Sequence, residues 1–282
     1  MASHTQHQQL LQLFKSGGSE NIELALTIGN GIEVNWLHLF QPYQQLLQQQ
    51  TPSLDAYLDL FSNTQLNWTN LKLQQLPNTL KDLQHLSHIY LDNNQLSKIE
   101  AVLLSFSNLK YLNLNKNKLQ TLPHELQPWQ TLKTLHLADN NIQELPDSIG
   151  ILTALQTLDL SRNKLRYLPT SIDQWQSLQQ LHLVRNELLY LPEEIAAWKT
   201  LEWLDLSYNK LQELPSEIGA LTNLRRLDLT YNPIDSLPDS IQRLSFLEEL
   251  VLHQTSISNA EQERLEQLLP NTKIKFNFDY FF

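Results

Sequence analysis

The fold is decided by residues 201–223, which read LEWLDLSYNKLQELPSEIGALTN. The same pattern, LxxLxLxxNxLxxLPxxIxxLxx, recurs along the chain without insertion, at a fixed period equal to the length of this stretch. Its first leucine stands at Leu86, Leu109, Leu132, Leu155, Leu178, Leu201, Leu224 and Leu247. Self-similarity at a short fixed period is the signature of a solenoid, in which each unit buries its apolar side chains against its neighbours. The sequence therefore predicts one continuous stack of about nine repeats.

Each part of the repeat has a physical role. The LxxLxL segment predicts a short strand whose leucines point inward, and successive strands should stack in parallel about 4.8 Å apart. The ninth position predicts a ladder of amide side chains that bond the backbone at the bend after each strand. This column reads Asn94, Asn117, Asn140, Asn163, Asn186, Asn209 and Asn232, and Thr255 ends it. The Leu-Pro pair then predicts a turn into a short helix or 3-10 segment, because proline fixes φ.

Three tryptophans share one position of the repeat. They are Trp129, Trp175 and Trp198, and other units place Leu152 or Leu221 there. Since large apolar residues replace one another at this position, we expect the tryptophans to fill the core and not to bind a ligand.

The repeat resembles the leucine-rich repeat family, in the variety with a Leu-Pro pair found in plant intracellular Ras-group-related and scribble-like proteins. The resemblance covers residues 63–258. It implies an α/β fold, a right-handed solenoid with a concave parallel β-sheet and a convex side of helical or 3-10 segments. It also implies a scaffold for protein–protein interaction, with a signalling protein or a small GTPase as partner. The segment LLPNTKIKF at 268–276 resembles the terminal strand of many bacterial relatives, so we expect a bacterial member.

The chain divides where the period begins. The repeats span residues 63–258, but residues 63–85 carry Leu71 where Asn is expected and predict a degenerate first repeat. Residues 1–62 lose the period and predict a helical N-terminal cap, with Ser19 as the N-cap of its second helix. A separate partner-binding bundle is the alternative for this block.

Residues 259–282 predict a C-terminal cap of one helix and a final strand. Ser258 and Glu261 have the spacing of a capping box at the start of that helix. Residues 272–278 alternate like a strand. The aromatic residues 280–282 are expected to pack on the last repeat, and an exposed docking tail is the alternative.

Composition excludes several classes of function. The 282 residues include no cysteine, which excludes disulfides, thiolate zinc sites and cysteine nucleophiles. The net charge of −10 argues against nucleic acid and anionic membranes, because both are bound through an excess of Lys and Arg. No apolar run suits a signal peptide or a membrane span, so we expect a cytoplasmic protein. No Gly-rich phosphate loop or other enzyme motif is present, and we expect no cofactor.

One outward-facing column of the strands carries titratable side chains. His136, Asp159 and His182 follow one another in it, so a metal-dependent enzyme is one alternative. Asp205 and Asp228 come next and could share a proton. An open sheet buries such groups little, and Asp is common at this strand position in the family without any metal. We therefore expect neither a metal site nor an enzyme.

The neighbouring columns carry residue types that are typical of protein interfaces. Trp203 and Arg226 are equivalent residues of successive repeats, and so are Tyr208 and Tyr231. Aromatic residues and arginine are enriched at binding hot spots. We predict a protein-binding site on the concave face made of Trp203, Tyr208, Arg226, Tyr231, Arg185 and His182. Recognition of a small ligand or a glycan is a further alternative.

Overall fold

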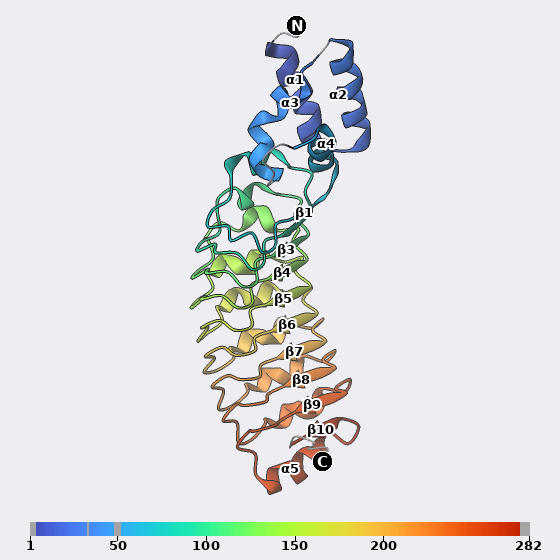
Figure 1. Cartoon of the computed structure of the whole chain (residues 1–282). Helices are drawn as coiled ribbons and strands as arrows, with labels where there is room; N and C mark the ends of the chain where they lie inside the picture. The colour runs from blue at the N-terminus through green and yellow to red at the C-terminus, as the bar shows by residue number, and fades with distance from the viewer. Residues whose placement is uncertain (1–3, 33, 48–51, 277–282) are drawn as a thin grey trace, which may run out of the picture.

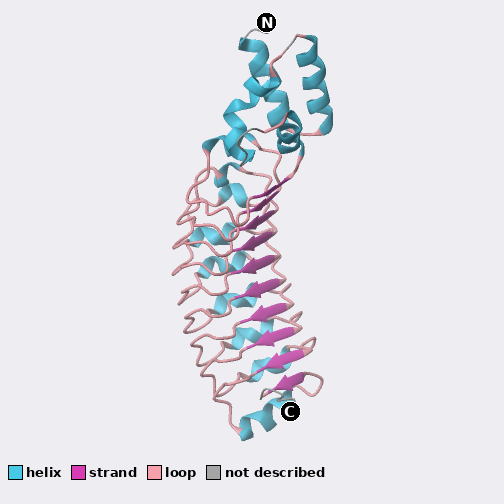
Figure 2. Ribbon diagram, viewed as in Figure 1, coloured by secondary structure: helices cyan, strands magenta, loops and turns pink. Residues whose placement is uncertain are grey.

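The computed structural model describes residues 4–32, 34–47 and 52–276, and these form one elongated, gently curved stack (Figure 1). A helical block lies at the N-terminal end, and helix α5 (Asn259–Leu268) lies at the other end. Strands line one side of the stack and short helical turns line the opposite side (Figure 2). The strands lie on the inner side of the curve, which confirms the predicted concave sheet.

The described residues form one sheet of ten parallel strands in sequence order. The strands are β1 (Gln65–Asn67), β2 (His88–Tyr90), β3 (Tyr111–Asn113), β4 (Thr134–His136), β5 (Thr157–Asp159), β6 (Gln180–His182), β7 (Trp203–Asp205), β8 (Arg226–Asp228), β9 (Glu249–Val251) and β10 (Lys273–Lys275). Neighbouring strands pair with a constant offset of one repeat, as Gln180 does with Trp203, and only the last step, from Glu249 to Lys273, is longer by a single residue. The middle residue of each strand points into the core, and its two neighbours face the concave side.

Short 3-10 segments cover the convex side of the repeats. They are η2 (Asn78–Asp82), η3 (Leu103–Ser105), η4 (Gln127–Trp129), η5 (Asp147–Ile151), η6 (Thr170–Gln174), η7 (Glu193–Ala197), η8 (Ser216–Ala220) and η9 (Asp239–Arg243). The proline of the Leu-Pro pair comes directly before most of them, as Pro215 does before η8 with a φ of −68°. Since the proline ring fixes this angle, the pair sets the direction in which the chain enters the convex side.

The hydrophobic core is continuous from Leu10 to Leu269. The three tryptophans of the shared position are fully buried in it, as predicted. Their indole N–H groups donate to backbone carbonyl oxygens one repeat earlier, and Trp175 reaches the oxygen of Ile149 at 3.0 Å. A buried indole needs such a partner, so these residues stabilise the stack.

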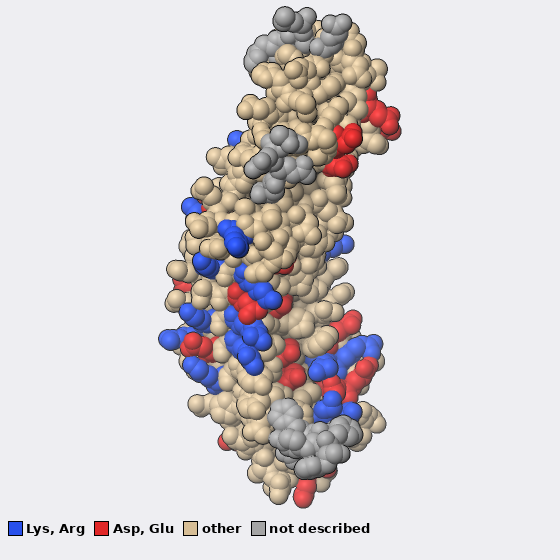
Figure 3. All heavy atoms as spheres, in the orientation of Figure 1, with Lys and Arg blue, Asp and Glu red and all other residues tan. Residues whose placement is uncertain are grey.

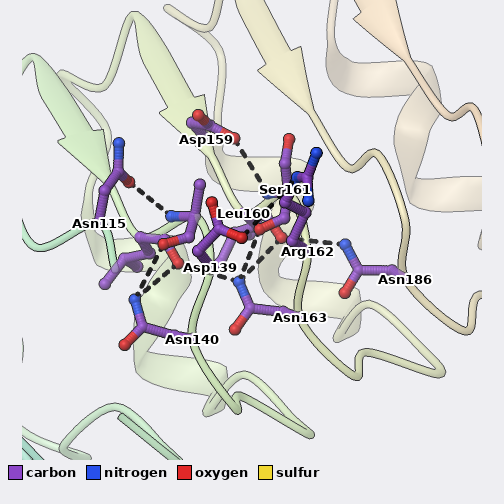
Figure 4. Close-up of polar contacts among 11 residues, drawn as sticks. Asn115, Asp139, Asn140, Asp159, Leu160, Ser161, Arg162, Asn163 and Asn186 are labelled. Carbon is purple, nitrogen blue, oxygen red and sulfur yellow. Dashed lines mark hydrogen bonds and ion pairs between the residues drawn. The ribbon is translucent and has the colours of Figure 1, made fainter. Parts of the chain in front are cut away.

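The asparagine ladder is formed as predicted (Figure 4). The side-chain amide of Asn163 donates to the carbonyl oxygens of Leu137 and Leu160 at 2.9 and 3.0 Å. Its own oxygen accepts a backbone N–H of the preceding repeat at 2.9 Å. The degenerate first repeat is completed by its neighbour, because the N–H of Leu71 donates to the side chain of Asn94 at 3.1 Å. Each rung thus satisfies backbone groups of two repeats.

Helices form the N-terminal block, and aromatic side chains fill it. Its helices are α1 (His4–Ser16), α2 (Ser19–Gly31), α3 (Trp36–Phe40), the 3-10 helix η1 (Gln41–Leu47) and α4 (Leu54–Ser62). The predicted role of Ser19 is wrong, because α2 begins at Ser19 and Gly18 is the N-cap residue. Gly18 has a φ of 83°, a conformation that glycine adopts without strain, so the glycine occupies the cap and the serine moves into the helix.

One carboxylate of the first repeat binds two side chains of the block. The hydroxyl of Tyr43 donates to Asp82 at 2.9 Å, and Lys15 forms an ion pair with the same carboxylate at 3.1 Å. Burial, followed by the bond to Asp82, raises the pKa of Tyr43. The tyrosine therefore stays a neutral donor in this contact.

The C-terminal helix α5 begins as predicted, with the hydroxyl of Ser258 accepting from the backbone N–H of Glu261 at 3.3 Å. The carboxylate of Glu261 accepts from the backbone N–H of Leu237 at 3.1 Å and pairs with Arg264 at 2.7 Å. It thereby ties the helix to the last repeats. The expected strand is present as β10, and the aromatic residues 280–282 lie outside the described residues.

Candidate functional site

Three of the predicted site residues lie side by side on the concave sheet. Trp203 on β7 pairs in register with Arg226 on β8, and the guanidinium carbon of Arg226 lies 5.2 Å from the centre of the indole ring. His182, on the strand at the other side, meets the same indole edge to face with ring centres 5.1 Å apart. We call these three residues the concave row.

Charged neighbours fix the concave row at its arginine end. Arg226 forms ion pairs with Glu249 at 3.0 Å and with Asp228 at 3.8 Å. Lys275 also binds Glu249, and the hydrogen bond from this lysine is the main cause that lowers the pKa of the Glu249 carboxyl. The indole N–H of Trp203 and Nε of Arg226 are inaccessible and have no hydrogen-bond partner among the described residues. The cation is thus held in position over the indole.

The other three predicted residues form a second row where the strands end. The rings of Tyr208 and Tyr231 are stacked, with centres 4.4 Å apart and an angle of 21° between their planes. The guanidinium carbon of Arg185 lies 4.8 Å from the centre of the Tyr208 ring. We call Arg185, Tyr208 and Tyr231 the strand-end row. Its tyrosines are 39% and 40% exposed, so this row offers accessible apolar surface whereas Trp203 is only partly exposed.

A left-handed backbone conformation, not anticipated from the sequence, shapes the strand-end row. Eight successive repeats place a non-glycine residue with φ between 53° and 57° at this position. They are Asn93, Lys116, Asp139, Arg162, Arg185, Tyr208, Tyr231 and Gln254. The N–H of Tyr208 donates to the oxygen of Thr230 in the next repeat at 2.7 Å, which helps to offset the strain. A signal was available, since β-branched residues, which strongly disfavour positive φ, are absent from this column.

The aspartates of the third strand position serve the turn that follows the strand. Asp159 accepts the backbone N–H two residues later, that of Ser161, at 2.9 Å (Figure 4). Asp205 and Asp228 accept the equivalent N–H groups at 3.0 Å. Burial raises the pKa of Asp205, and bonds from Ser207 oppose the shift. The sequence signal is Asp or Asn at the third strand position, because such a side chain can accept the backbone N–H two residues later, as Asn113 also does from Asn115.

The alternative of a metal site at His136, Asp159 and His182 finds no support in the geometry. The three residues are neighbours in register on β4, β5 and β6. However, no group of three or more His, Cys, Asp or Glu within the described ranges is placed to hold a metal ion. Burial lowers the pKa of His136, so its imidazole is neutral at pH 7, and Asp159 is engaged in the turn.

A further aromatic cluster near the N-terminal end of the sheet was not predicted. The ring of Tyr111 on β3 lies 4.8 Å from that of Tyr90 on β2 and 5.5 Å from that of His136 on β4. His88 stacks on Tyr111 at 5.9 Å. These residues occupy the first and third positions of their strands, as the residues of the concave row do. The sequence pattern that predicted the concave row could therefore have predicted this cluster as well. The concave face therefore carries aromatic side chains at two levels, on either side of β5.

Comparison with known proteins settles the family. The model of the leucine-rich repeat region matches residues 100–190 and 181–278. The chain belongs to the leucine-rich repeat family. A solved leucine-rich repeat protein of Leptospira interrogans is 34% identical over 75% of this chain and 60% of its own, with a TM-score of 0.65. No curated protein matches the chain.

Two plant receptors share the fold of this leucine-rich repeat chain. The ectodomain of the membrane receptor kinase GASSHO1/SCHENGEN3 from Arabidopsis thaliana, solved in complex with Casparian strip integrity factor 2, is 27% identical with a TM-score of 0.65. The match covers 78% of this chain and 27% of the receptor chain. The plant peptide hormone receptor RGFR1, solved in complex with RGF2, is 26% identical with a TM-score of 0.56 over 72% of this chain and 37% of its own.

The chain thus spans at most 60% of the length of these relatives. Within the part of the chain that the structure describes, none of the helices combines the length and the apolar character that crossing a membrane requires.

Proposed function

We propose that this chain is a non-enzymatic protein-interaction module that binds a polypeptide partner at the concave row and the strand-end row. The observation that carries the proposal is that two arginines and three aromatic rings, on three successive repeats, are already packed against their neighbours within each of the two rows. Binding costs less conformational entropy when the contacting side chains are held in place beforehand. Aromatic and arginine side chains are also the residues that contribute most at protein interfaces.

The solved relatives support a polypeptide as the partner, because two of them were determined in complex with a named factor or hormone. The similarity of the repeat to Ras-group-related proteins makes a small GTPase or another signalling protein the first partner class to test. A bacterial origin is supported by the 34% identity to the Leptospira protein. A cytoplasmic location agrees with the absence of cysteine, since reducing compartments do not favour disulfides.

The proposal is tested with one truncation in each row. Partners captured by the purified chain are identified by mass spectrometry, and the affinity of the strongest is then measured by calorimetry for Trp203→Ala and Tyr231→Ala. Truncation of a hot-spot residue costs about 2 kcal/mol or more, so each variant should bind about 30-fold more weakly.

The matched controls are equivalent residues of other repeats. Thr134→Ala alters the strand position of Trp203, and Gln254→Ala alters the left-handed position of Tyr231. Both controls should bind like the original chain. Unchanged affinity in the two row variants, at intact thermal stability, would show that the partner binds elsewhere.

A further inference from the structure

Lysine and arginine side chains gather on the loops that follow the strands, although the chain as a whole is acidic. They occupy the left-handed residue of the repeat and the positions two and four residues after it. Those that are exposed and outside the strand-end row are Lys116, Lys118, Arg162, Lys164, Arg166 and Lys210. We call these residues the basic flank, and Figure 3 shows Lys and Arg gathered over the middle of the stack. Since the chain has 20 Lys and Arg against 30 Asp and Glu, this gathering is not a consequence of composition.

The carboxylates that lie among these cations do not neutralise the basic flank. Glu187 is bound by Lys210 at 3.0 Å and by Arg166 at 3.7 Å, and Asp139 pairs with the arginine of the next repeat at 3.8 Å. The hydrogen bond from Lys210 is the main cause that lowers the pKa of the Glu187 carboxyl. Lys164 acts on this carboxylate only at longer range and forms no ion pair with a described residue. Its charge is therefore available to a ligand.

An exposed apolar patch lies beside the basic flank, outside the concave face. Tyr167 and Tyr190 are equivalent residues of successive repeats, with ring centres 5.3 Å apart. They are 48% and 49% exposed, and Leu189, which takes the position of Arg166 in the next repeat, is 43% exposed. We call the two tyrosines and this leucine the loop patch. Contiguous exposed apolar residues commonly mark an interaction surface.

A surface cavity brings the cations and the loop patch together. It has a volume of about 420 Å³ and is lined by Gln143, Glu144, Lys164, Arg166, Tyr167 and Glu187. The equivalent loops three repeats earlier form a cavity of about 480 Å³, lined by Gln74, Gln75, Gln95, Ser97 and Lys118. The repeat therefore produces the shape of the cavity in both places. The cation pair and the aromatic ring distinguish the cavity in the middle of the stack from the neutral, amide-rich one.

We propose that the basic flank and the loop patch bind an acidic polypeptide segment that carries apolar side chains. Lys164 and Arg166 receive its carboxylates in the cavity, and the loop patch receives its apolar side chains. The surface is complementary to such a segment in charge and in apolar character, which together favour fast and selective association. It is separate from the concave site, because Arg185, which continues the left-handed column, is packed on Tyr208 in the strand-end row.

The same surface fits a polypeptide better than a nucleic acid. A nucleic acid carries a phosphate on every nucleotide and would place some of them against Glu144 and Glu187, which line the cavity beside the cations. A polypeptide can place uncharged residues opposite these carboxylates. Leu189 also offers aliphatic surface, whereas a single-stranded nucleic acid is bound by stacking its bases on aromatic rings. The net charge of −10 further opposes a long polyanion.

The proposal is tested with the full chain and a fluorescein-labelled peptide of repeated Asp-Glu-Phe-Leu units, by fluorescence anisotropy. A second peptide has Ser in place of Phe and Leu, and a third has Lys in place of Asp and Glu. The first peptide should bind most tightly and the lysine peptide should not bind. The affinity of the first peptide should fall as salt is added, because the charges on this flank are exposed and easily screened.

Two double variants remove the two components of the site. Lys164→Gln with Arg166→Gln uses the residue that other repeats carry at these positions, as Gln95 and Gln143 show, so the fold should be preserved. Loss of two exposed cations should weaken binding of the first peptide about tenfold. Tyr167→Ser with Tyr190→Ser follows Ser236, which stands at the tyrosine position of a later repeat. It should weaken the first peptide about tenfold and leave the serine peptide unchanged.

Matched controls change the same residue types elsewhere. Lys110→Gln with Lys133→Gln removes two lysines that directly precede β3 and β4, at the opposite end of the strands. Phe246→Ala removes an aromatic ring that is 58% exposed. Both controls should bind the first peptide like the original chain. Trp203→Ala should do so as well, so this proposal and the concave site can fail separately.

Three outcomes would overturn the proposal. The first is equal affinity of the double variants and their controls for the acidic peptide, at unchanged thermal stability. The second is tighter binding of a labelled oligothymidylate than of the peptide, with loss of that binding in the Lys164 and Arg166 variant, which would assign the flank to nucleic acid. The third is self-association of the free chain in sedimentation velocity that the same variant abolishes, which would make a second copy the occupant.

Discussion

At the scale of single residues, the ladder asparagines satisfy backbone groups that neither strands nor turns can reach. Asn163→Ala removes four such hydrogen bonds from a buried position. We expect a loss of about 1–3 kcal/mol in the free energy of unfolding, because the backbone partners stay buried and unsatisfied. Thermal unfolding measures the loss, and Asn141→Ala, an amide with no side-chain hydrogen bond among the described residues, is the control. Equal midpoints for the two variants would contradict the role of the ladder.

A single histidine gives the stability a defined pH dependence. His85 lies between the helical block and the first repeat, with Nε2 3.3 Å from the backbone oxygen of Leu60. Burial is the main cause that lowers its pKa below the ordinary value of 6.5. As the pH falls, the imidazole of the unfolded chain binds a proton at a higher pH than the imidazole of the folded chain does. The free energy of unfolding is therefore highest above pH 6.5 and decreases as the pH falls toward and through the folded-state pKa. His136 contributes in the same direction.

The unfolding midpoint should therefore be lower at about pH 5 than at about pH 7.5. His85→Gln should reduce the difference without abolishing it, because His136 remains. An identical pH dependence in this variant would assign the effect to other groups.

At the scale of elements, neighbouring convex turns lie in close contact where glycine faces serine. A β-carbon built on Gly150 would lie 2.4 Å from the backbone oxygen of Ser171, and Gly219 meets Ser240 in the same way. Gly150→Ala should force η5 and η6 apart and cost about 1–3 kcal/mol, as overpacking generally does. Ala196, at the equivalent position of η7, shows that alanine is tolerated elsewhere, so Ala196→Gly is the control in chemical unfolding. A stable Gly150→Ala variant would mean that the turns separate freely.

At the scale of the whole molecule, we propose that residues 1–62 act as the N-terminal cap. The core runs without a break from Phe61 of the block to Leu66 of the first repeat, and Asp82 receives Tyr43 and Lys15 from the block. Deletion of residues 1–62 would expose the apolar end of the stack, so we expect aggregation or a loss of cooperative unfolding. Light scattering and thermal unfolding measure both effects. A monomeric truncated chain of equal stability would identify the block as a separate module.

The fixed length of the repeat identifies equivalent residues, and it therefore predicts every structural feature that repeats from unit to unit. The strands, the ladder, the buried tryptophans and the neighbours across strands all follow from the constant offset of one repeat, as Trp203 beside Arg226 shows. The capping serine of α5 followed from a local motif that does not need the period. In each case a short-range rule and the repeat pointed to the same structure.

The features that could not be predicted depend on the direction in which a side chain leaves the backbone. The left-handed backbone that Tyr208 and Tyr231 share was not predicted, because alternation along a strand says nothing about the φ of the residues that follow the strand. The exposed pair Tyr167 and Tyr190 was missed for a related reason, because both residues lie on irregular loops without an inward and outward period. Asp159 and Asp205, considered alone, suggested metal binding or proton sharing. Their position at the end of a strand, two residues before a free backbone N–H, indicates an Asx turn instead.

The constant length of the repeat gives the binding surface a fixed unit of distance. Two strand residues of the repeats that are one repeat apart are neighbours on adjacent strands, about 4.8 Å from each other. Excision of residues 155–177 would keep the register of every remaining strand and bring Asp139 next to Arg185. Gain or loss of whole repeats can therefore change the order of side chains along the surface while leaving the spacing and register of neighbouring strands unchanged.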